Sequence, residues 1–230
     1  MITGRNLVSF STESTKLRHP RLRLFQYYLR PYQIRARQMR SQWFRSALGI
    51  KPNMRVIDLG GTPAIWNFVD VPLDITILNL VHAPTAQSEA EAIRHHKFSF
   101  ITGDACNTDL PSNGFDVVFC NSVIEHVGNK DRRSALAANV RRLARKHWVQ
   151  TPAKYFPIEA HTGMPFWWYY PESLRQSFIR RWQEQLPLWT EMVEGTTLVE
   201  LVELQQLFPE AAIYPERHFG IVKSYVCIGS

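Results

Sequence analysis

Short, β-branched, apolar segments alternate with helix-like segments between residues 55 and 151, and no other feature of this sequence restricts the fold as strongly. Five of these segments have the length and composition of buried strands, namely 55–59, 75–80, 98–101, 115–120 and 147–151. Two further strand-like runs, 212–214 and 221–228, follow a helix that begins at the capping box 197–200. Strands that alternate with helical crossovers form a doubly wound parallel sheet with helices on both faces. We therefore predict an α/β fold.

The first fifty residues are strongly basic. They contain ten arginines and lysines against one acidic residue, Glu13, whereas the other 180 residues carry 17 basic and 19 acidic groups. Aromatic and aliphatic side chains are interleaved with the arginines at the spacing of an amphipathic helix. Pro20 and Pro31 should divide the segment into short helices, the longest over 33–48 and ending at Gly49. The segment is either a phosphate-binding face or a helical lid whose arginines bind a carboxylate, and we favour the lid.

The chain of 230 residues has the size of one elaborated domain. We divide it into a basic helical N-terminal lid, 1–49, and a main domain, 50–230. The main domain contains an insertion at about 152–187 that is rich in aromatic residues and proline and that we expect to form loops and helices. We therefore expect one functional site on one hydrophobic core.

Several classes of protein are disfavoured by what the sequence lacks. It has no stretch of 18 apolar residues and no secretion signal, so we expect a soluble, cytoplasmic protein without a membrane partner. Cys106, Cys120 and Cys227 are separated by 14 and 107 residues, which fits neither a metal knuckle nor a disulfide framework, and we interpret them as reduced core thiols. The eight histidines show no metal-ligand spacing, which predicts that no metal is bound. Monomer and homodimer remain equally open.

The segment Asp58-Leu-Gly60-Gly61-Thr62-Pro-Ala64 carries the most chemical information. A buried strand that ends in an acid, a glycine pair and a proline forms a tight turn in which a ligand approaches the backbone closely. The carboxylate of Asp58 would repel a pyrophosphate, but it can hold an ammonium group. The turn therefore favours a cationic adenosine ligand over a dinucleotide.

This turn resembles the first motif of the class I S-adenosylmethionine-dependent methyltransferases, and in particular the small-molecule enzymes similar to type 11. In that family an acid is normally followed by three alternate glycines. Here Gly60 takes the first glycine position, while Thr62 and Ala64 take the second and third. The resemblance implies S-adenosylmethionine as cosubstrate or sole substrate. It also implies a Rossmann-like, mostly parallel, seven-stranded sheet with an antiparallel last strand, preceded here by the N-terminal helical lid.

Three later motifs stand where the same family would place them. Asn79, 21 residues after Asp58 and followed by Leu80, matches the position of the acid that holds the ribose hydroxyls. Asp104 and Ala105 resemble the motif that binds adenine, and Asn121 and Ser122 resemble the segment that passes under the sulfonium. The resemblance thus implies a cofactor site made of Asp58, Gly60, Gly61, Thr62, Asn79, Leu80, Asp104, Ala105, Asn121 and Ser122.

Four polar residues are candidates for catalysis. His126 or His161 could act as a base, and Asn121 or Tyr155 could accept a proton. Each has a structural alternative: His126 is as often structural as catalytic at such a position, and Tyr155 and His161 could be a buried polar pair that braces the insertion. The aromatic run 166–170 is either core packing under the lid, which we favour, or a wall for a sulfonium or a planar substrate.

Three functions are compatible with these residues. Methyl transfer to a small-molecule nucleophile is the first choice, because it is the commonest reaction of the family. The second is cyclisation of S-adenosylmethionine to azetidine-2-carboxylate and methylthioadenosine, a reaction of secondary metabolism found in an offshoot of the superfamily, with a lid arginine binding the carboxylate. The third is an RNA-binding or RNA-modifying protein. Asn121 is followed by Ser-Val-Ile-Glu instead of the Pro-Pro-aromatic run of base-amino methyltransferases, so a nucleic-acid partner is disfavoured.

Overall fold

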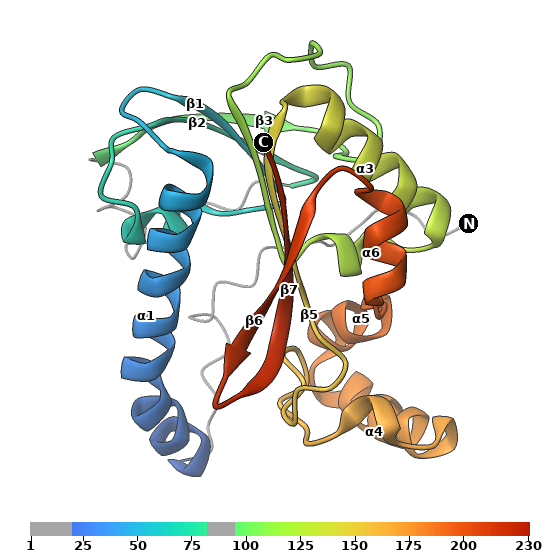
Figure 1. The fold of residues 1–230 in the computed structure, drawn as a ribbon. Helices are drawn as coiled ribbons and strands as arrows, with labels where there is room; N and C mark the ends of the chain where they lie inside the picture. Colours follow the sequence, from blue (N-terminus) through green and yellow to red (C-terminus); the bar gives the residue numbers. More distant parts are fainter. Residues whose placement is uncertain (1–19, 82–94) are drawn as a thin grey trace.

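The computed structural model describes residues 20–81 and 95–230, which fold around one mixed sheet (Figure 1). Its strands are β1 (Arg55–Leu59), β2 (Asp74–Asn79), β3 (Lys97–Thr102), β4 (Val117–Asn121), β5 (Lys146–Pro152), β6 (Ala212–His218) and β7 (Ile221–Gly229). The seven strands lie in the order β3-β2-β1-β4-β5-β7-β6. All neighbours are parallel except β7, which is antiparallel to both β5 and β6. The predicted Rossmann-like sheet with an antiparallel last strand is confirmed.

Both faces of the sheet are buried at the central strands β1, β4 and β5, whereas the edge strands β3 and β6 are largely exposed. One core lies on the side of α3 (Lys130–Leu143) and α6 (Leu201–Leu207), and the other lies on the side of α1 (Pro20–Leu48). Figure 1 shows these helices on opposite sides of the strands. Alternate residues of each central strand enter the two cores, so Ile57 packs toward α3 while Val56 packs toward α1.

The crossover helices are less regular than the sequence predicts. A six-residue 3₁₀ helix, η1 (Pro63–Phe68), stands between β1 and β2, and residues 103–116, between β3 and β4, contain no helix. The C-terminal part of α1 covers the face that a longer crossover would cover. Its Phe44 packs edge-on against Trp66, Phe119 and Trp148, with ring centroids 6.0, 5.1 and 5.8 Å away. This end of the N-terminal segment therefore belongs to the core.

Helix α1 runs from Pro20 to Leu48 without interruption, so the expected division at Pro31 is wrong. A proline removes one backbone donor from a helix, and a helix of 29 residues retains its other hydrogen bonds. The expected end of the helix is confirmed, because Gly49 adopts the left-handed conformation (φ 59°) that stops it. Residues 1–19, which include Glu13 and the start of the predicted lid, lie outside the described residues.

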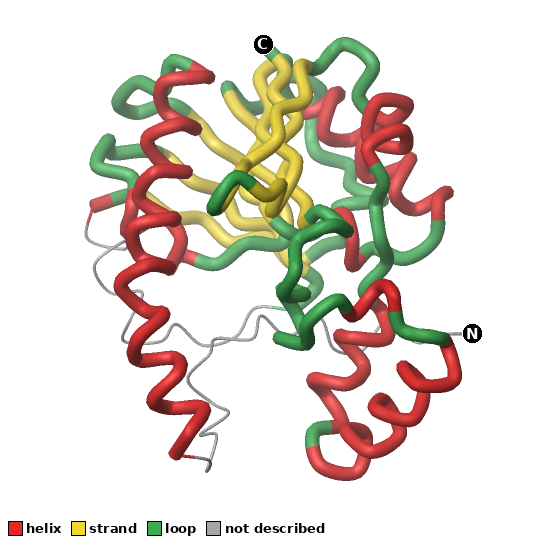
Figure 2. The backbone as a smooth tube through the Cα atoms, turned by 60° about the horizontal axis from the view of Figure 1, so that its bottom comes forward, coloured by secondary structure: helices red, strands yellow, loops and turns green. Residues whose placement is uncertain are grey.

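The segment after β5 forms the predicted loops and helices, namely η4 (Trp167–Tyr169), α4 (Glu172–Gln185) and α5 (Pro187–Gly195). Trp167 lies against Tyr170, Phe178 and Trp182 at centroid distances of 5.9, 6.3 and 5.4 Å. Figures 1 and 2 show α4 and α5 on the opposite side of the sheet from α1. Trp167 and Tyr170 therefore pack within the insertion and not under α1, contrary to the expectation, whereas Phe166 and Tyr169 are exposed (56% and 55%).

Two simpler expectations can be compared directly with the structure. All three cysteines are buried and free, which confirms their interpretation as core thiols. Among residues 20–81 and 95–230, no helix combines the length and the apolar character that a membrane span requires.

Candidate functional site

The turn after β1 is built around two glycines. Gly60 has a φ of 77°, and a Cβ there would lie 2.9 Å from a methyl group of Val123. A Cβ on Gly61 would lie 1.9 Å from a carboxylate oxygen of Asp58. Only glycine permits this backbone at position 60, and only glycine leaves room for the carboxyl group beside position 61. Thr62 then precedes η1 in an extended conformation without a side-chain cap.

Asp58 is buried beneath this turn, with 1% of its surface exposed. Its Oδ2 accepts a hydrogen bond of 2.9 Å from the indole Nε1 of Trp66. Burial raises the pKa of Asp58 to about 7, although the bond from Trp66 acts in the opposite direction. A cation beside this carboxyl would favour its charged form.

The ends of β2 and β3 lie next to the turn. Asn79 donates from Nδ2 to the carbonyl oxygen of Gly61 (3.4 Å), and its Oδ1 accepts from the backbone of Leu80 (2.9 Å). Gly103 donates to the carbonyl oxygen of Asn79 (3.0 Å), which brings the Asp104–Ala105 segment beside it. These contacts place three of the four motifs along one edge of the sheet.

Asp104 already has partners in the protein. Its Oδ1 accepts from the backbone of Cys106 (2.9 Å), and both its oxygens accept from Arg132 (3.1 and 2.9 Å). Burial acts to raise the pKa of Asp104, but these bonds and the charge of Arg132 outweigh it, and the pKa lies below its ordinary value. Asp104 is therefore ionised, and a bound adenine would share it with Arg132.

The fourth motif ends β4 at the same edge. Ser122 has a φ of 57°, a left-handed conformation that costs a residue with a side chain about 1–3 kcal/mol. Two bonds to Gln150 of β5 hold it there, one from the Ser122 backbone (2.9 Å) and one from its hydroxyl (2.8 Å). The neighbouring Asn121 accepts from Nη1 of Arg40 at 3.5 Å. Strain held in place by its neighbours is typical of functional sites.

Arg40 connects α1 to the far edge of the sheet, a contact that the sequence did not predict. It pairs with Glu216 of β6 through Nη2 and Oε2 (2.7 Å) and through Nε and Oε1 (3.2 Å). Only 15% and 11% of the two side chains are exposed. Ser224 donates a further hydrogen bond to Glu216. The pair holds α1 in place over the carboxyl ends of the strands.

A small pocket, partly open to solvent, lies between α1, η1 and β4. It is lined by Arg37 and Arg40 on one side and by apolar groups such as Trp66 and Phe119 on the other. Arg37 makes no hydrogen bond or ion pair with another residue that the structure describes. Partial desolvation, followed by the charge of Arg40, lowers its pKa. The pocket thus offers an anionic group a guanidinium that has no partner among the described residues.

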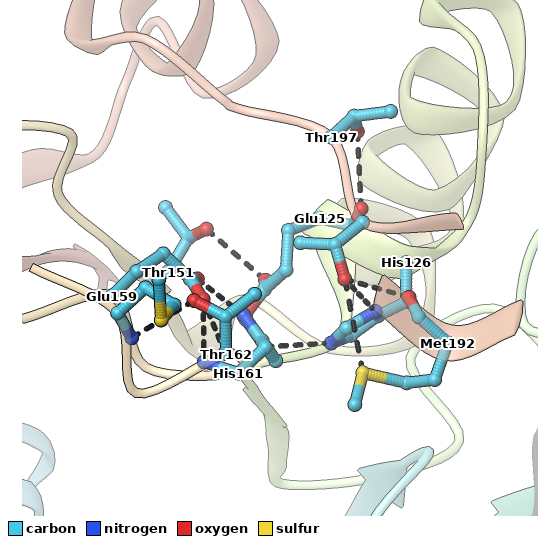
Figure 3. Close-up of polar contacts among 10 residues, drawn as sticks. Glu125, His126, Thr151, Glu159, His161, Thr162, Met192 and Thr197 are labelled. Carbon is cyan, nitrogen blue, oxygen red and sulfur yellow. Dashed lines mark hydrogen bonds and ion pairs between the residues drawn. The ribbon is translucent and has the colours of Figure 1, made fainter. Parts of the chain in front are cut away.

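A second polar cluster, formed by Glu125, His126, Glu159 and His161, follows β4 and β5 (Figure 3). The Nε2 atoms of His126 and His161 are 3.0 Å apart, although 35 residues separate them. His161 Nδ1 lies 2.8 Å from Glu159 Oε1, and His126 Nδ1 lies 3.2 Å from the hydroxyl of Thr196. Glu125 is 2% exposed, and its Oε2 accepts from Thr151 (3.0 Å). We call these four residues the acceptor-side cluster.

The four side chains of this cluster influence one another's pKa values. Burial, followed by the charge of His161, lowers the pKa of His126 to about 4. Burial would also lower the pKa of His161, but its bond to Glu159 outweighs this and raises it. Burial raises the pKa of Glu125 to about 7. Groups with such displaced pKa values gather at functional sites.

The structure separates the predicted catalytic residues. It brings His126 and His161 together, and it places Asn121 beside Arg40. Tyr155 is 63% exposed, so the alternative of a buried Tyr155–His161 pair is wrong. Sequence reasoning did not select Glu125 and Glu159 as site residues. The available signal was that each lies within two residues of a candidate histidine.

Comparisons with known proteins agree with this geometry at the level of the fold. Residues 61–148 match the family described as a methyltransferase domain. The chain is similar to N-methyltransferase NodS from Bradyrhizobium japonicum, with 9% identity, a TM-score of 0.50, and coverage of 86% of this chain and 96% of that one. It is also similar to magnesium protoporphyrin IX methyltransferase from Synechocystis with bound S-adenosylmethionine, with 11% identity, a TM-score of 0.47, and coverage of 89% and 83%. No curated protein matches the sequence.

Proposed function

This chain carries a class I S-adenosylmethionine-dependent methyltransferase domain and is a transferase that uses S-adenosylmethionine, and from that premise we propose that it methylates a small molecule. The acceptor supplies a nucleophilic atom in line with the bond between the sulfonium sulfur and its methyl carbon. The methyl carbon bonds to that atom, the electrons of the broken bond return to sulfur, and S-adenosylhomocysteine leaves. The proton of the acceptor is released to the cluster or to water.

The arginine-lined pocket is the observation that carries this proposal. Trp66 lines the pocket and also donates to Asp58, so the pocket adjoins the glycine turn. In the proposed complex, Arg37 binds the methionine carboxylate and Asp58 faces the ammonium group. Gly60, Gly61 and Thr62 approach the ligand through the backbone. Asn79 and Leu80 hold the ribose, Asp104 and Ala105 hold the adenine, and Asn121 and Ser122 lie under the sulfonium.

The acceptor-side cluster favours an external acceptor over the intramolecular alternative. Glu125 and His126 follow Asn121 and Ser122 directly after β4, so the cluster begins where the sulfonium is proposed to lie. Cyclisation to azetidine-2-carboxylate uses the cofactor's own amine, which must lose one proton, and it needs no group that orients a second molecule. Methylation of a separate molecule needs groups that orient the acceptor and accept its proton.

Two arginines of α1 are engaged within the protein, which leaves fewer of them for an RNA partner. Arg40 is committed to Glu216, and Arg45 is paired with Asp70. An RNA site needs several arginines free to meet phosphates. A salt-sensitive affinity for RNA would contradict the proposal.

Mass spectrometry of the sulfur product tests the proposed reaction. S-adenosylmethionine incubated with the purified protein alone should stay intact, apart from the breakdown seen without protein. With a panel of small alcohols, phenols and amines, at least one acceptor should yield S-adenosylhomocysteine and a methylated product. Methylthioadenosine and azetidine-2-carboxylate formed from S-adenosylmethionine alone would overturn methyl transfer in favour of cyclisation.

The Arg37→Gln variant tests the proposed carboxylate contact. Losing a charge-assisted bond of about 1.5–3 kcal/mol should weaken S-adenosylmethionine binding about 10- to 150-fold. Isothermal titration calorimetry measures this affinity. Arg35→Gln is the matched control, because Arg35 lies on the same helix, is exposed and does not line the pocket. Equal affinities of the two variants would place the carboxylate elsewhere.

A further inference from the structure

The two histidines of the acceptor-side cluster have their protons placed by their neighbours. Thr196 donates its hydroxyl hydrogen to the carbonyl oxygen of Met192 (2.8 Å), so its oxygen can accept from Nδ1–H of His126 (3.2 Å). His161 likewise donates from Nδ1 to the carboxylate of Glu159 (2.8 Å). A neutral imidazole carries one ring proton. Both Nε2 atoms therefore present lone pairs to each other at 3.0 Å.

Two facing lone pairs need a positive species between them. One solution is a third proton, shared by the two imidazoles. The other is a metal ion bound by both Nε2 atoms. The carboxylate–histidine arrangement at Glu159 and His161 is the usual outer support of a metal-bound imidazole, since it fixes the ring and raises its basicity. The Thr196 hydroxyl supports His126 in the same way.

Glu125 distinguishes the two solutions. It is 2% exposed, and its Oε1 is buried without a hydrogen-bond partner among the described residues, while Thr151 holds Oε2. A ligand atom of Glu125 lies within 4.8 Å of those of His126 and His161, and of the described residues only these three form such a group. A shared proton leaves Oε1 unsatisfied. A cation contacts it together with both imidazoles.

We propose that Glu125, His126 and His161 bind one divalent transition metal ion, with Zn²⁺ as the best fit to two imidazoles and one carboxylate. Zinc sites of this composition are known to combine three protein ligands with one open position. The ion offsets the negative charge of the buried Glu125 carboxylate, whose Oε1 otherwise has no partner among the described residues. The open position would take an oxygen of the acceptor and favour its deprotonated form. Only this last step rests on the proposed function; ion binding does not.

Zn²⁺ titration of the untagged full-length protein without S-adenosylmethionine tests the site. Calorimetry should show one saturable ion per chain, and Co²⁺ in its place should give visible d–d absorption. His161→Ala and Glu125→Gln should each weaken binding more than about 100-fold, beyond the usual effect of losing an outer support. His95→Ala is the matched control, because His95 is exposed and lies outside the cluster. Wild-type protein that binds no ion, or variants that bind as tightly as His95→Ala, would overturn the proposal.

Glu159→Gln keeps the test decisive if the ligand variants fail to fold, as circular dichroism would reveal. It retains all three ligand side chains and changes only the group that accepts from His161. Zn²⁺ affinity should fall about 10- to 100-fold. Unchanged affinity would mean that the ion binds elsewhere. Because S-adenosylmethionine binding is measured separately at the Arg37 pocket, failure of the metal site and failure of the proposed methyl transfer give different results.

Discussion

The Gly61→Ala variant is expected to lose most of its affinity for S-adenosylmethionine. The new methyl group would stand 1.9 Å from Oδ2 of Asp58, and that carboxyl is enclosed beneath the turn. Either the turn or the strand must move, and overpacking of this kind costs about 3 kcal/mol at the upper end of its usual range. If this cost destabilises the conformation of the turn that binds S-adenosylmethionine, the affinity drops about 100-fold. Calorimetry with S-adenosylmethionine measures the loss, and urea denaturation measures the accompanying loss of stability.

Gly195→Ala is the matched control for this variant. A Cβ at Gly195 meets nothing within 4 Å, so this substitution should leave both affinity and stability nearly unchanged. Adding Asp58→Ala to Gly61→Ala should restore part of the lost stability, because the colliding carboxyl group is then absent. Wild-type affinity in Gly61→Ala would mean that the turn does not approach the ligand. If the stability losses of the two single variants simply add up in the double variant, the Asp58 carboxyl is not the group with which a side chain at position 61 collides.

The Arg40→Met variant should lower the free energy of unfolding by about 3 kcal/mol, because it leaves the buried Glu216 carboxylate without its arginine and only with Ser224 and His218 beside it. The exposed fractions of the two side chains are 15% and 11%, which limits compensation by water. The loss of the Arg40–Asn121 contact should also weaken cofactor binding. Lys97→Met is the matched control, since Lys97 is 77% exposed in its pair with Asp74 and should contribute less than about 1 kcal/mol. Equal losses in the two variants would refute the importance of the Arg40–Glu216 pair.

The same pair predicts how stability depends on pH. Burial acts to raise the pKa of Glu216, but the charge and hydrogen bonds of Arg40, helped by Ser224, hold it below its ordinary value. A carboxyl whose pKa is lower in the folded state stabilises the fold above its unfolded pKa and loses that effect as the pH falls. The stability difference between wild type and Arg40→Met should therefore be full at neutral pH and shrink below about pH 4.3. A difference that grows on acidification would contradict this assignment.

Local sequence was sufficient for the strands and for the turn after β1. β1 and β4 are short, mainly apolar runs, and such runs are stable only when both faces are covered. Gly60 signals its turn directly, because its φ of 77° is costly for any other residue. The extent of α1 was not predictable in the same way. Whether a helix continues past Pro31 depends on what stabilises the rest of it, and its last turns are held by Phe44 and Leu48 in the core.

The sequence by itself determined the parallel sheet and the order of the motifs along its carboxyl edge, because strand formation and tight turns depend on neighbouring residues. Tertiary structure decided which charged groups meet. Arg40 and Glu216 are 176 positions apart, and His126 and His161 are 35 apart, so no local pattern links them. The direction in which each histidine ring presents its Nε2 atom was set by Thr196 and Glu159. Ring orientation follows from packing and hydrogen bonding across the fold, and this is why the acceptor-side cluster emerges only in three dimensions.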